Sequence, residues 1–233
     1  MPPPPPPSPP TPPPTVGAPP VGPADETRRR LVEAATTGFA EQGVHTASLL
    51  EITRRAGQRN RGAVHYHFGS RTGMLVAVLE QHVELLSARE HELLAVARAR
   101  PDDDLASAVE ALVRPAVELA ELGGQGRAYL SILAQLVDED PASMDPDVVG
   151  ALERLGGYDA YALLEQRVPP MADDVRSERL SLVTAFILRA IADRGRAVEQ
   201  PSGRPQLDLE PFAANLVAMV VGMLSAPAPA PSG

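Results

Sequence analysis

The segment Leu49–Phe68 reads LLEITRRAGQRNRGAVHYHF and predicts two short helices joined by a tight turn. Ser48 and Glu51 form a capping box, in which each side chain satisfies a free backbone N–H, so we expect the first helix to begin at Leu49. Gly57 follows the last apolar residue at helical spacing, where a left-handed conformation ends a helix at low cost. A helix-turn-helix unit of this kind usually places its second helix in the major groove of DNA.

Charge is divided unevenly along the 233-residue chain, whose net charge is −9. Residues 24–72 contain 8 Arg against 5 acidic residues, whereas residues 73–233 contain 13 Arg against 25 acidic residues. A basic N-terminal unit on an acidic body fits localised contact with DNA phosphates, which would repel the body. The alternative is that short segments differ in charge by chance. The triplet Arg28–Arg30 is either a solvated cluster or a clamp for a phosphate.

Both ends of the chain are low in complexity. Residues 1–23 contain 14 prolines and predict a disordered tail, and residues 226–233 form a second, shorter one. The first segment has neither the basic start nor the apolar core of a signal peptide. The most apolar run near the C-terminus, Phe212–Leu224, is shorter than the roughly 20 residues that a membrane span needs. We therefore expect a soluble, cytoplasmic protein with no membrane partner.

Apolar residues recur at helical spacing along the chain, and no period-two pattern appears, so the expected fold class is all-α. A helix-turn-helix domain of three helices is expected at residues 24–72, and a larger helical domain at residues 73–225. The pattern predicts about nine helices: residues 25–43, the two within 49–68, and then 71–100, 105–122, 127–137, 145–166, 173–194 and 208–224.

The last two of these helices are apolar around much of their circumference, which is more than one core requires. Excess apolar surface on paired helices favours a two-fold interface between subunits, built as a four-helix arrangement. The alternative is burial within a larger monomer core. The predicted interface residues are Phe186, Leu188, Phe212, Leu216 and Val220.

Three blocks of the sequence resemble the DNA-binding domain of TetR/AcrR-type transcriptional regulators. They are FAEQG at Phe39–Gly43, HTASLLEITRRAG at His45–Gly57 and GAVHYHFGSRTGML at Gly62–Leu75. The resemblance covers about residues 26–80, and the later helices fit the family's ligand-binding, dimerising body by their pattern alone. The turn Gln58–Arg61 is one residue longer than the common turn of the family.

The resemblance implies a homodimeric repressor that reads a palindromic operator in double-stranded DNA and releases it when a small molecule enters the body. Side chains at the turn and at the start of the second helix reach base edges in this motif. Arginine there suits guanine, asparagine suits adenine, and an alanine methyl group suits the thymine methyl group. Hydroxyl and basic side chains at helix starts suit phosphates. The predicted DNA-contacting residues are Thr46, Ser48, Arg59, Asn60, Arg61, Ala63, His65, Tyr66 and Arg71.

The body is expected to enclose the effector site, because pocket walls are usually apolar with a few polar groups. The candidate ligand contacts are Tyr129, Gln135, Tyr158 and Tyr161, each of which could equally be ordinary core or surface. With 4 Tyr, 4 Phe and no Trp, the sequence favours a modest apolar or amphipathic effector, or a regulator that has none.

The spacing of the candidate catalytic residues does not indicate an enzyme. His65 and His67 are two apart on a predicted helix, so they point roughly 200° apart and cannot share a metal ion. The chain contains no HExxH, GxSxG or GxxxxGK[ST] motif, and no cysteine for a thiolate site. We therefore expect no catalytic residues, metal or cofactor. The remaining alternative is a helical ligand-binding or scaffold protein without specific DNA binding.

Overall fold

The computed structural model describes residues 22–60, 62–137, 139–199 and 205–227. Regular structure within these ranges is entirely helical, which confirms the predicted all-α class. The helices are α1 (Pro23–Gln42), α2 (Leu49–Arg55), α3 (Ala63–Phe68), α4 (Arg71–Leu79), η1 (Glu80–His82), α5 (Val83–Arg98), α6 (Leu105–Glu121), α7 (Gly124–Val137), η2 (Pro141–Ser143), α8 (Pro146–Arg154), α9 (Tyr158–Arg167), α10 (Asp173–Glu199) and α11 (Leu209–Ser225). None of them is long and apolar enough to cross a membrane.

Two helices that the sequence predicts as continuous are interrupted. The predicted helix at 71–100 is divided into α4 and α5 by the 3-10 turn η1. The predicted helix at 145–166 is divided into α8 and α9 at Gly156 and Gly157, whose φ angles are 86° and 89°. An α-helix needs negative φ, so the chain must turn there. Apolar spacing continues through both breaks, which is why periodicity did not reveal them.

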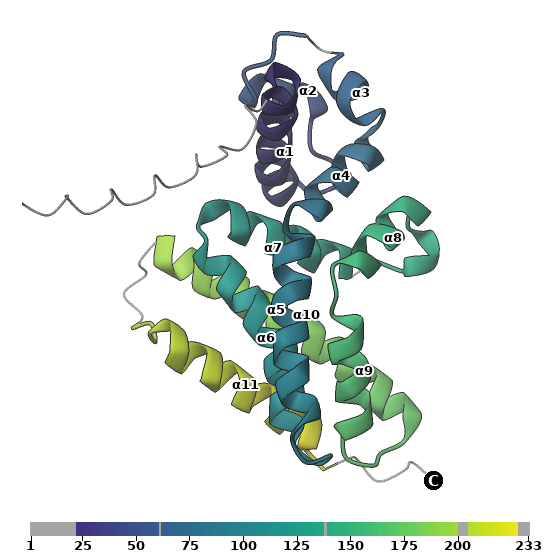
Figure 1. The fold of residues 1–233 in the computed structure, drawn as a ribbon, viewed down its shortest axis with the longest axis vertical. Coiled ribbons are helices and arrows are strands. Elements are labelled where there is room, and N and C mark those ends of the chain that lie inside the picture. Colours follow the sequence, from purple (N-terminus) through teal and green to yellow (C-terminus); the bar gives the residue numbers. More distant parts are fainter. Residues whose placement is uncertain (1–21, 61, 138, 200–204, 228–233) are drawn as a thin grey trace, which may run out of the picture.

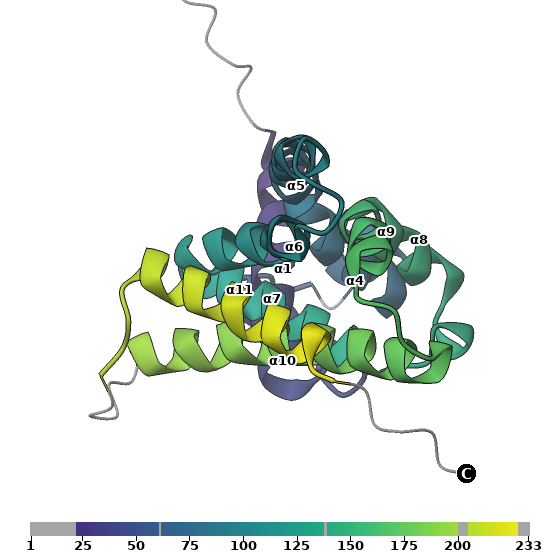
Figure 2. The same cartoon turned by 90° about the horizontal axis from the view of Figure 1, so that it is seen from below.

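Helices α1–α3 form a head at one end of the molecule, α4 leads out of it, and α5–α11 form the body (Figure 1). Helices α10 and α11 lie side by side along one face of the body (Figure 2). They run antiparallel, because Arg179 of α10 donates to the Leu224 carbonyl at the end of α11, while Arg194 donates to the Leu207 carbonyl just before its start.

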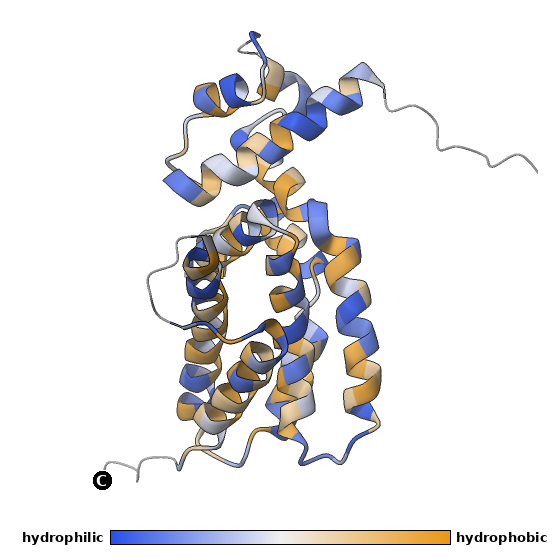
Figure 3. Cartoon of the chain, turned by 90° about the vertical axis from the view of Figure 1, so that its left-hand side faces the viewer, coloured by the Kyte–Doolittle hydropathy of each residue, from blue (hydrophilic) through white to orange (hydrophobic). Residues whose placement is uncertain are grey.

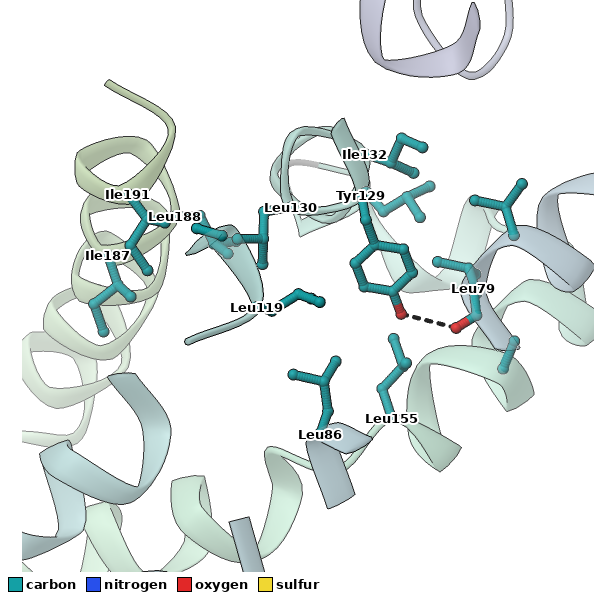
Figure 4. Packing of buried hydrophobic residues seen from close by; sticks show 14 of the residues in the cluster. Leu79, Leu86, Leu119, Tyr129, Leu130, Ile132, Leu155, Ile187, Leu188 and Ile191 are labelled. Carbon is teal, nitrogen blue, oxygen red and sulfur yellow. Dashed lines mark hydrogen bonds between the residues drawn. The ribbon is translucent and has the colours of Figure 1, made fainter. Parts of the chain in front are cut away.

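One hydrophobic core runs from the head into the body. Phe39 of α1, Met74 of α4 and Tyr129 of α7 all belong to it and are completely buried. The Tyr129 hydroxyl donates to the Leu79 carbonyl oxygen at 2.8 Å (Figure 4). Burial raises the pKa of Tyr129, so the hydroxyl keeps its proton. The segment that joins head and body is strongly hydrophobic (Figure 3), which couples the two by packing.

Two buried charged side chains hold α9 in place. Glu90 of α5 accepts from the backbone N–H groups of Gly157 at 2.6 Å and Ala160 at 3.1 Å, and so caps the start of α9. Arg167, at its other end, donates to the carbonyl oxygens of Ala97 and Asp104. Both charges are hydrogen-bonded, as buried charges must be to avoid a large desolvation cost.

Three of the predicted interface residues lie inside the chain. Leu188, Leu216 and Val220 are 8%, 2% and 0% exposed, so they belong to the core of a single chain, the alternative that the sequence left open. Phe186 and Phe212 are half-buried, and Phe212 lies under the Arg194 guanidinium at 4.7 Å. The apolar excess of α10 and α11 is therefore largely used within the chain.

Candidate functional site

Local backbone contacts build the predicted helix-turn-helix from α2 and α3. Ser48 caps α2, because its hydroxyl oxygen accepts from the Glu51 N–H at 3.3 Å. Gly57 follows α2 with a φ of +71°, which suits the left-handed stop expected there. Asn60 lies in the turn before the second helix, where its Oδ1 accepts from the N–H of Gly62, the N-cap residue of α3, at 2.9 Å. These contacts hold α3 at the outer end of the head (Figure 1).

The turn and α3 expose a group of polar side chains. Arg59, Asn60, His65 and Tyr66 are all exposed, and Tyr66 is 81% exposed, which is unusual for a large aromatic residue. His65 donates from Nδ1 to the Gly69 carbonyl oxygen at 2.7 Å, because a carbonyl can only accept. Its Nε2 takes no part in this bond and is left for an external partner. This group can hydrogen-bond and stack on an external partner.

At the start of the recognition segment, two of the predicted DNA-contacting residues make contacts within the chain. Ala63 is 6% exposed and packs in the head, which leaves little of its methyl group for the predicted contact with a thymine. Asn60 uses Oδ1 for the Gly62 N–H, although a paired contact to adenine would need both atoms of its amide. The predicted contact residue Arg61 lies outside the described residues.

Arg71 has a structural role that the sequence did not reveal. Its guanidinium donates to the carbonyl oxygens of Val44 at 3.1 Å and Ala47 at 2.7 Å, and it lies over the Phe39 ring at 6.0 Å. These contacts hold the loop between α1 and α2 and use two of the five N–H donors of the guanidinium. The partners are 24 and 27 residues away, so no local pattern announces them.

The loop that Arg71 holds presents both predicted hydroxyl contacts. Thr46 and Ser48 are exposed at the end of this loop. The Thr46 hydroxyl donates to the Gln42 carbonyl oxygen, and the Ser48 hydroxyl oxygen accepts the cap bond of α2. Each oxygen can still accept a further hydrogen bond, and the Ser48 hydroxyl hydrogen can still donate.

The arginine triplet of α1 is divided between two environments. Arg29 and Arg30 both pair with Glu26 of the same helix, at 2.8 Å and 2.7 Å. The hydrogen bonds from Arg29 and then Arg30 lower the pKa of Glu26 to about 2. Arg28 instead lies 5.3 Å from the Phe68 ring at the end of α3. The structure therefore places Arg28, one of the three arginines considered for a phosphate clamp, at the edge of the helix-turn-helix, whereas Arg29 and Arg30 pair with Glu26.

The body contains an apolar cavity of ≈ 510 Å³, within the range of small-molecule sites. Tyr158 and Tyr161, two of the four candidate ligand contacts, line it. Burial, and secondarily Glu165, raises the pKa of Tyr161, so that side chain is a neutral hydrogen-bond donor. The cavity wall is Leu112, Leu133, Leu136, Val137, Glu139, Pro141, Met144, Val149, Leu152, Leu155, Gly156, Gly157, Tyr158, Tyr161, Thr184 and Leu188.

The other two predicted ligand contacts lie outside this wall. Tyr129 is a core residue, bonded as described above. Gln135 joins head to body, because its Oε1 accepts from the Val44 N–H at 3.1 Å and its Nε2 donates to the Phe39 carbonyl oxygen at 3.4 Å. These partners are 91 and 96 residues away. In the part of the chain that the structure describes, no group of three or more His, Asp or Glu side chains could hold a metal ion.

Comparison with protein families agrees with the division into head and body. Residues 31–78 match the model described as bacterial regulatory proteins of the tetR family, and residues 110–223 match the model described as a tetracyclin repressor-like C-terminal domain. The two matches are adjacent domains of one family and together span most of the chain.

Individual relatives match mainly through the head. The regulators SrpR and TtgW, both of Pseudomonas putida, are each 43% identical over 70 residues, which is 30% of this chain and 29% and 46% of theirs. The transcriptional activator FasR of Mycolicibacterium smegmatis is 39% identical over 64 residues, 28% of this chain and 29% of its own length. The match therefore spans less than half of each relative.

Solved structures share the whole fold at low identity. A HlyIIR mutant aligns over 87% of this chain and 97% of its own, with a TM-score of 0.57 and 14% identity. The probable transcriptional regulatory protein RHA5900 aligns over 86% of this chain and all of its own, with a TM-score of 0.52 and 22% identity. At these identities the likeness shows the fold alone.

Proposed function

We propose that this protein, which belongs to the tetR family of bacterial transcriptional regulators, is a homodimeric repressor that binds a palindromic operator and releases it when a small molecule fills its cavity. The relatives are regulators and not enzymes, and the head carries the DNA-binding unit of the family. Repression is the direction we favour because the body matches a repressor-like domain, although FasR is an activator.

The exposure of the α3 side chains is the observation that carries the proposal. Tyr66 is 81% exposed, and Arg59 and His65 are exposed beside it, so this surface lacks the packing that an aromatic residue normally has. Duplex DNA supplies the missing partners: base edges for Arg59, and bases or phosphates for His65 and Tyr66. We assign Thr46, Ser48 and Arg28 to the flanking phosphates.

For the dimer we propose the outer face of α10 and α11. Because Leu188, Leu216 and Val220 are buried within the chain, the interface must use their neighbours on the exposed side. Leu182 of α10 is 55% exposed and Met219 of α11 is 46% exposed. Apolar side chains exposed on a pair of adjacent helices favour a two-fold contact with a second copy.

A dimer reads DNA only when its two α3 helices reach successive major grooves, about 34–36 Å apart. In our proposal an effector in the cavity changes this spacing through α4, which links head and body. The effector must bind the dimer conformations with the two spacings at different affinities, since equal affinities would not shift the equilibrium between them. Dimers cross-linked between their heads while on DNA should then stay bound whatever effector is added.

The test begins by selecting binding sites for the purified protein from random DNA duplexes. We expect a palindromic site, bound more weakly as salt rises because phosphate contacts release counterions. Arg59→Ala should weaken binding to that site by at least about tenfold, since a paired arginine–guanine contact discriminates by about 1–3 kcal/mol. The matched control is Arg98→Ala, which removes a half-exposed arginine at the far end of α5.

Failure to enrich any site would contradict the proposal and leave the alternative, a helical ligand-binding protein without specific DNA binding. Equal losses for Arg59→Ala and Arg98→Ala would also contradict it, because only the first lies at the helix-turn-helix. A selected site without two-fold symmetry would contradict the proposed binding of a symmetric dimer.

A further inference from the structure

The cavity wall holds one charged side chain among the described residues, Glu139. Every other described wall residue is apolar, glycine or a neutral hydroxyl-bearing side chain. The Glu139 side chain is 26% exposed, so it is partly desolvated at the edge of an apolar space. A carboxylate there favours a ligand that brings a positive charge and disfavours one that brings a negative charge.

Glu139 also touches the head. His45 Nε2 lies 2.7 Å from Glu139 Oε1, and the contact joins residues 94 apart. A carboxylate can only accept, so the imidazole donates the hydrogen from Nε2. His45 belongs to the loop between α1 and α2, which also presents Thr46 and Ser48. A carboxylate of the cavity wall thus contacts the DNA-binding head directly.

We propose that the effector is an amphipathic cation, an alkyl or aryl ammonium whose apolar part fills the cavity and whose charge pairs with Glu139 in place of His45. This inference rests on the proposed function in taking the cavity as the effector site. Tyr158 and Tyr161 in the same wall add to the preference, because the faces of aromatic rings attract cations. Loss of the His45 contact then removes one of the restraints on the loop that carries Thr46 and Ser48, which Arg71 and Gln135 continue to hold.

The exposure of His45 limits how strongly the His45–Glu139 contact can oppose binding of the cation. Its side chain is 71% exposed, and ion pairs this exposed contribute little, so removing His45 should raise ligand affinity by no more than about fivefold. Glu139 should affect the affinity for the cation more than His45 does, since charge-assisted contacts are stronger than neutral ones. Binding of DNA and of the cation should weaken each other by the same factor, because the coupling is reciprocal.

The experiment measures binding of three ten-carbon probes by isothermal titration calorimetry on the full chain without DNA. The probes are decylammonium, whose N–H groups can donate to a carboxylate, decanol and decanoate, all below their aggregation concentrations. We expect the cation to bind most tightly and decanoate most weakly. Glu139→Gln should weaken the cation by about tenfold, the size of a partly exposed charge-assisted contact, and leave decanol unchanged.

Two further variants make the result specific. Glu153→Gln removes an exposed carboxylate of α8 that is not part of the wall, and it should leave all three affinities unchanged. His45→Ala should strengthen cation binding and leave decanol unchanged. Thermal unfolding of each variant, at one protein concentration, verifies that the fold is intact.

Absence of saturable cation binding, equal affinity for the three probes, or an unchanged affinity in Glu139→Gln would each overturn the inference. Since these titrations contain no DNA, they are independent of the site selection described above. A protein that selects an operator but shows no preference for the cation would retain the proposed function and lose this inference. Unchanged cation affinity in His45→Ala would overturn the competition between His45 and the ligand.

Discussion

Head and body use polar groups in opposite ways. In the head, many of them lie on the surface and are set by neighbours in the chain: Asn60 bonds Gly62, His65 bonds Gly69, and Tyr66 is exposed. In the body, Glu90 and Arg167 are buried and bond backbone groups more than 60 residues away. Polar groups near the surface can be satisfied by water or DNA, whereas buried ones must find partners within the fold.

The largest difference in stability between head and body variants should come from substituting two tyrosines. Tyr129→Ala removes a completely buried side chain of the body and should lower the free energy of unfolding by about 3–5 kcal/mol. Tyr66→Ala removes a largely exposed side chain of the head and should change it by less than about 0.5 kcal/mol, while weakening DNA binding. Urea unfolding followed by circular dichroism, at one protein concentration, measures both.

Tyr129→Phe is the control for this pair. It keeps the ring and removes only the bond to the Leu79 carbonyl oxygen, so the loss should be about 1 kcal/mol. If Tyr66→Ala cost as much as Tyr129→Ala, the head surface would have to be packed against the rest of the chain.

Two glycines give the next contrast. A Cβ at Gly156 would lie 2.1 Å from Glu90 Oε2, whereas a Cβ at Gly57 would meet nothing within 4 Å. Both have positive φ, which costs an L-residue about 1–2 kcal/mol. Gly156→Ala should therefore destabilise by about 2–4 kcal/mol, because it also disturbs the cap that Glu90 provides.

Thermal or urea unfolding of the two alanine variants measures the difference. Gly57→Ala should show only the backbone cost. Equal effects would indicate that Glu90 moves aside freely, and its role in holding the start of α9 would then be smaller than the two hydrogen bonds suggest.

Two arginines separate stability from DNA binding within the head. Arg71→Ala removes the donors to the Val44 and Ala47 carbonyl oxygens and should cost about 2 kcal/mol. Arg59→Ala should leave stability within about 0.5 kcal/mol, since its side chain is exposed, and should weaken operator binding. Unfolding and fluorescence anisotropy on labelled operator measure the two effects on the same samples.

The role of Arg71 would change if its variant were as stable as the parent and defective only on DNA. That outcome would return Arg71 to the phosphate contact predicted from the sequence.

The smallest effect should come from the cap of α2. Ser48→Ala removes the acceptor for the Glu51 N–H and should cost about 1 kcal/mol. Ser48→Asp restores a cap with a negative charge, so it should recover stability while weakening DNA binding by repulsion from phosphate. Recovery of both properties in Ser48→Asp would argue against a phosphate next to Ser48.

Local patterns predicted the head well. The capping box placed the start of α2 at Leu49, the glycine after it has the expected positive φ, and the family resemblance agrees with the matched families. Each of these depends on contacts within a few residues, which a sequence displays directly. The same patterns missed Arg71, because its partners lie on an earlier loop.

The sequence by itself determined the all-α class, the helix-turn-helix and the family, since helical spacing and capping residues act over one or two turns. Only the tertiary structure decided what covers each apolar face. It buried Leu216 and Val220 within the chain, left an apolar cavity behind Tyr161, and brought Glu139 to His45 across 94 residues. Periodicity identifies the face of a helix that avoids water, but the packing of all the helices together selects its partner.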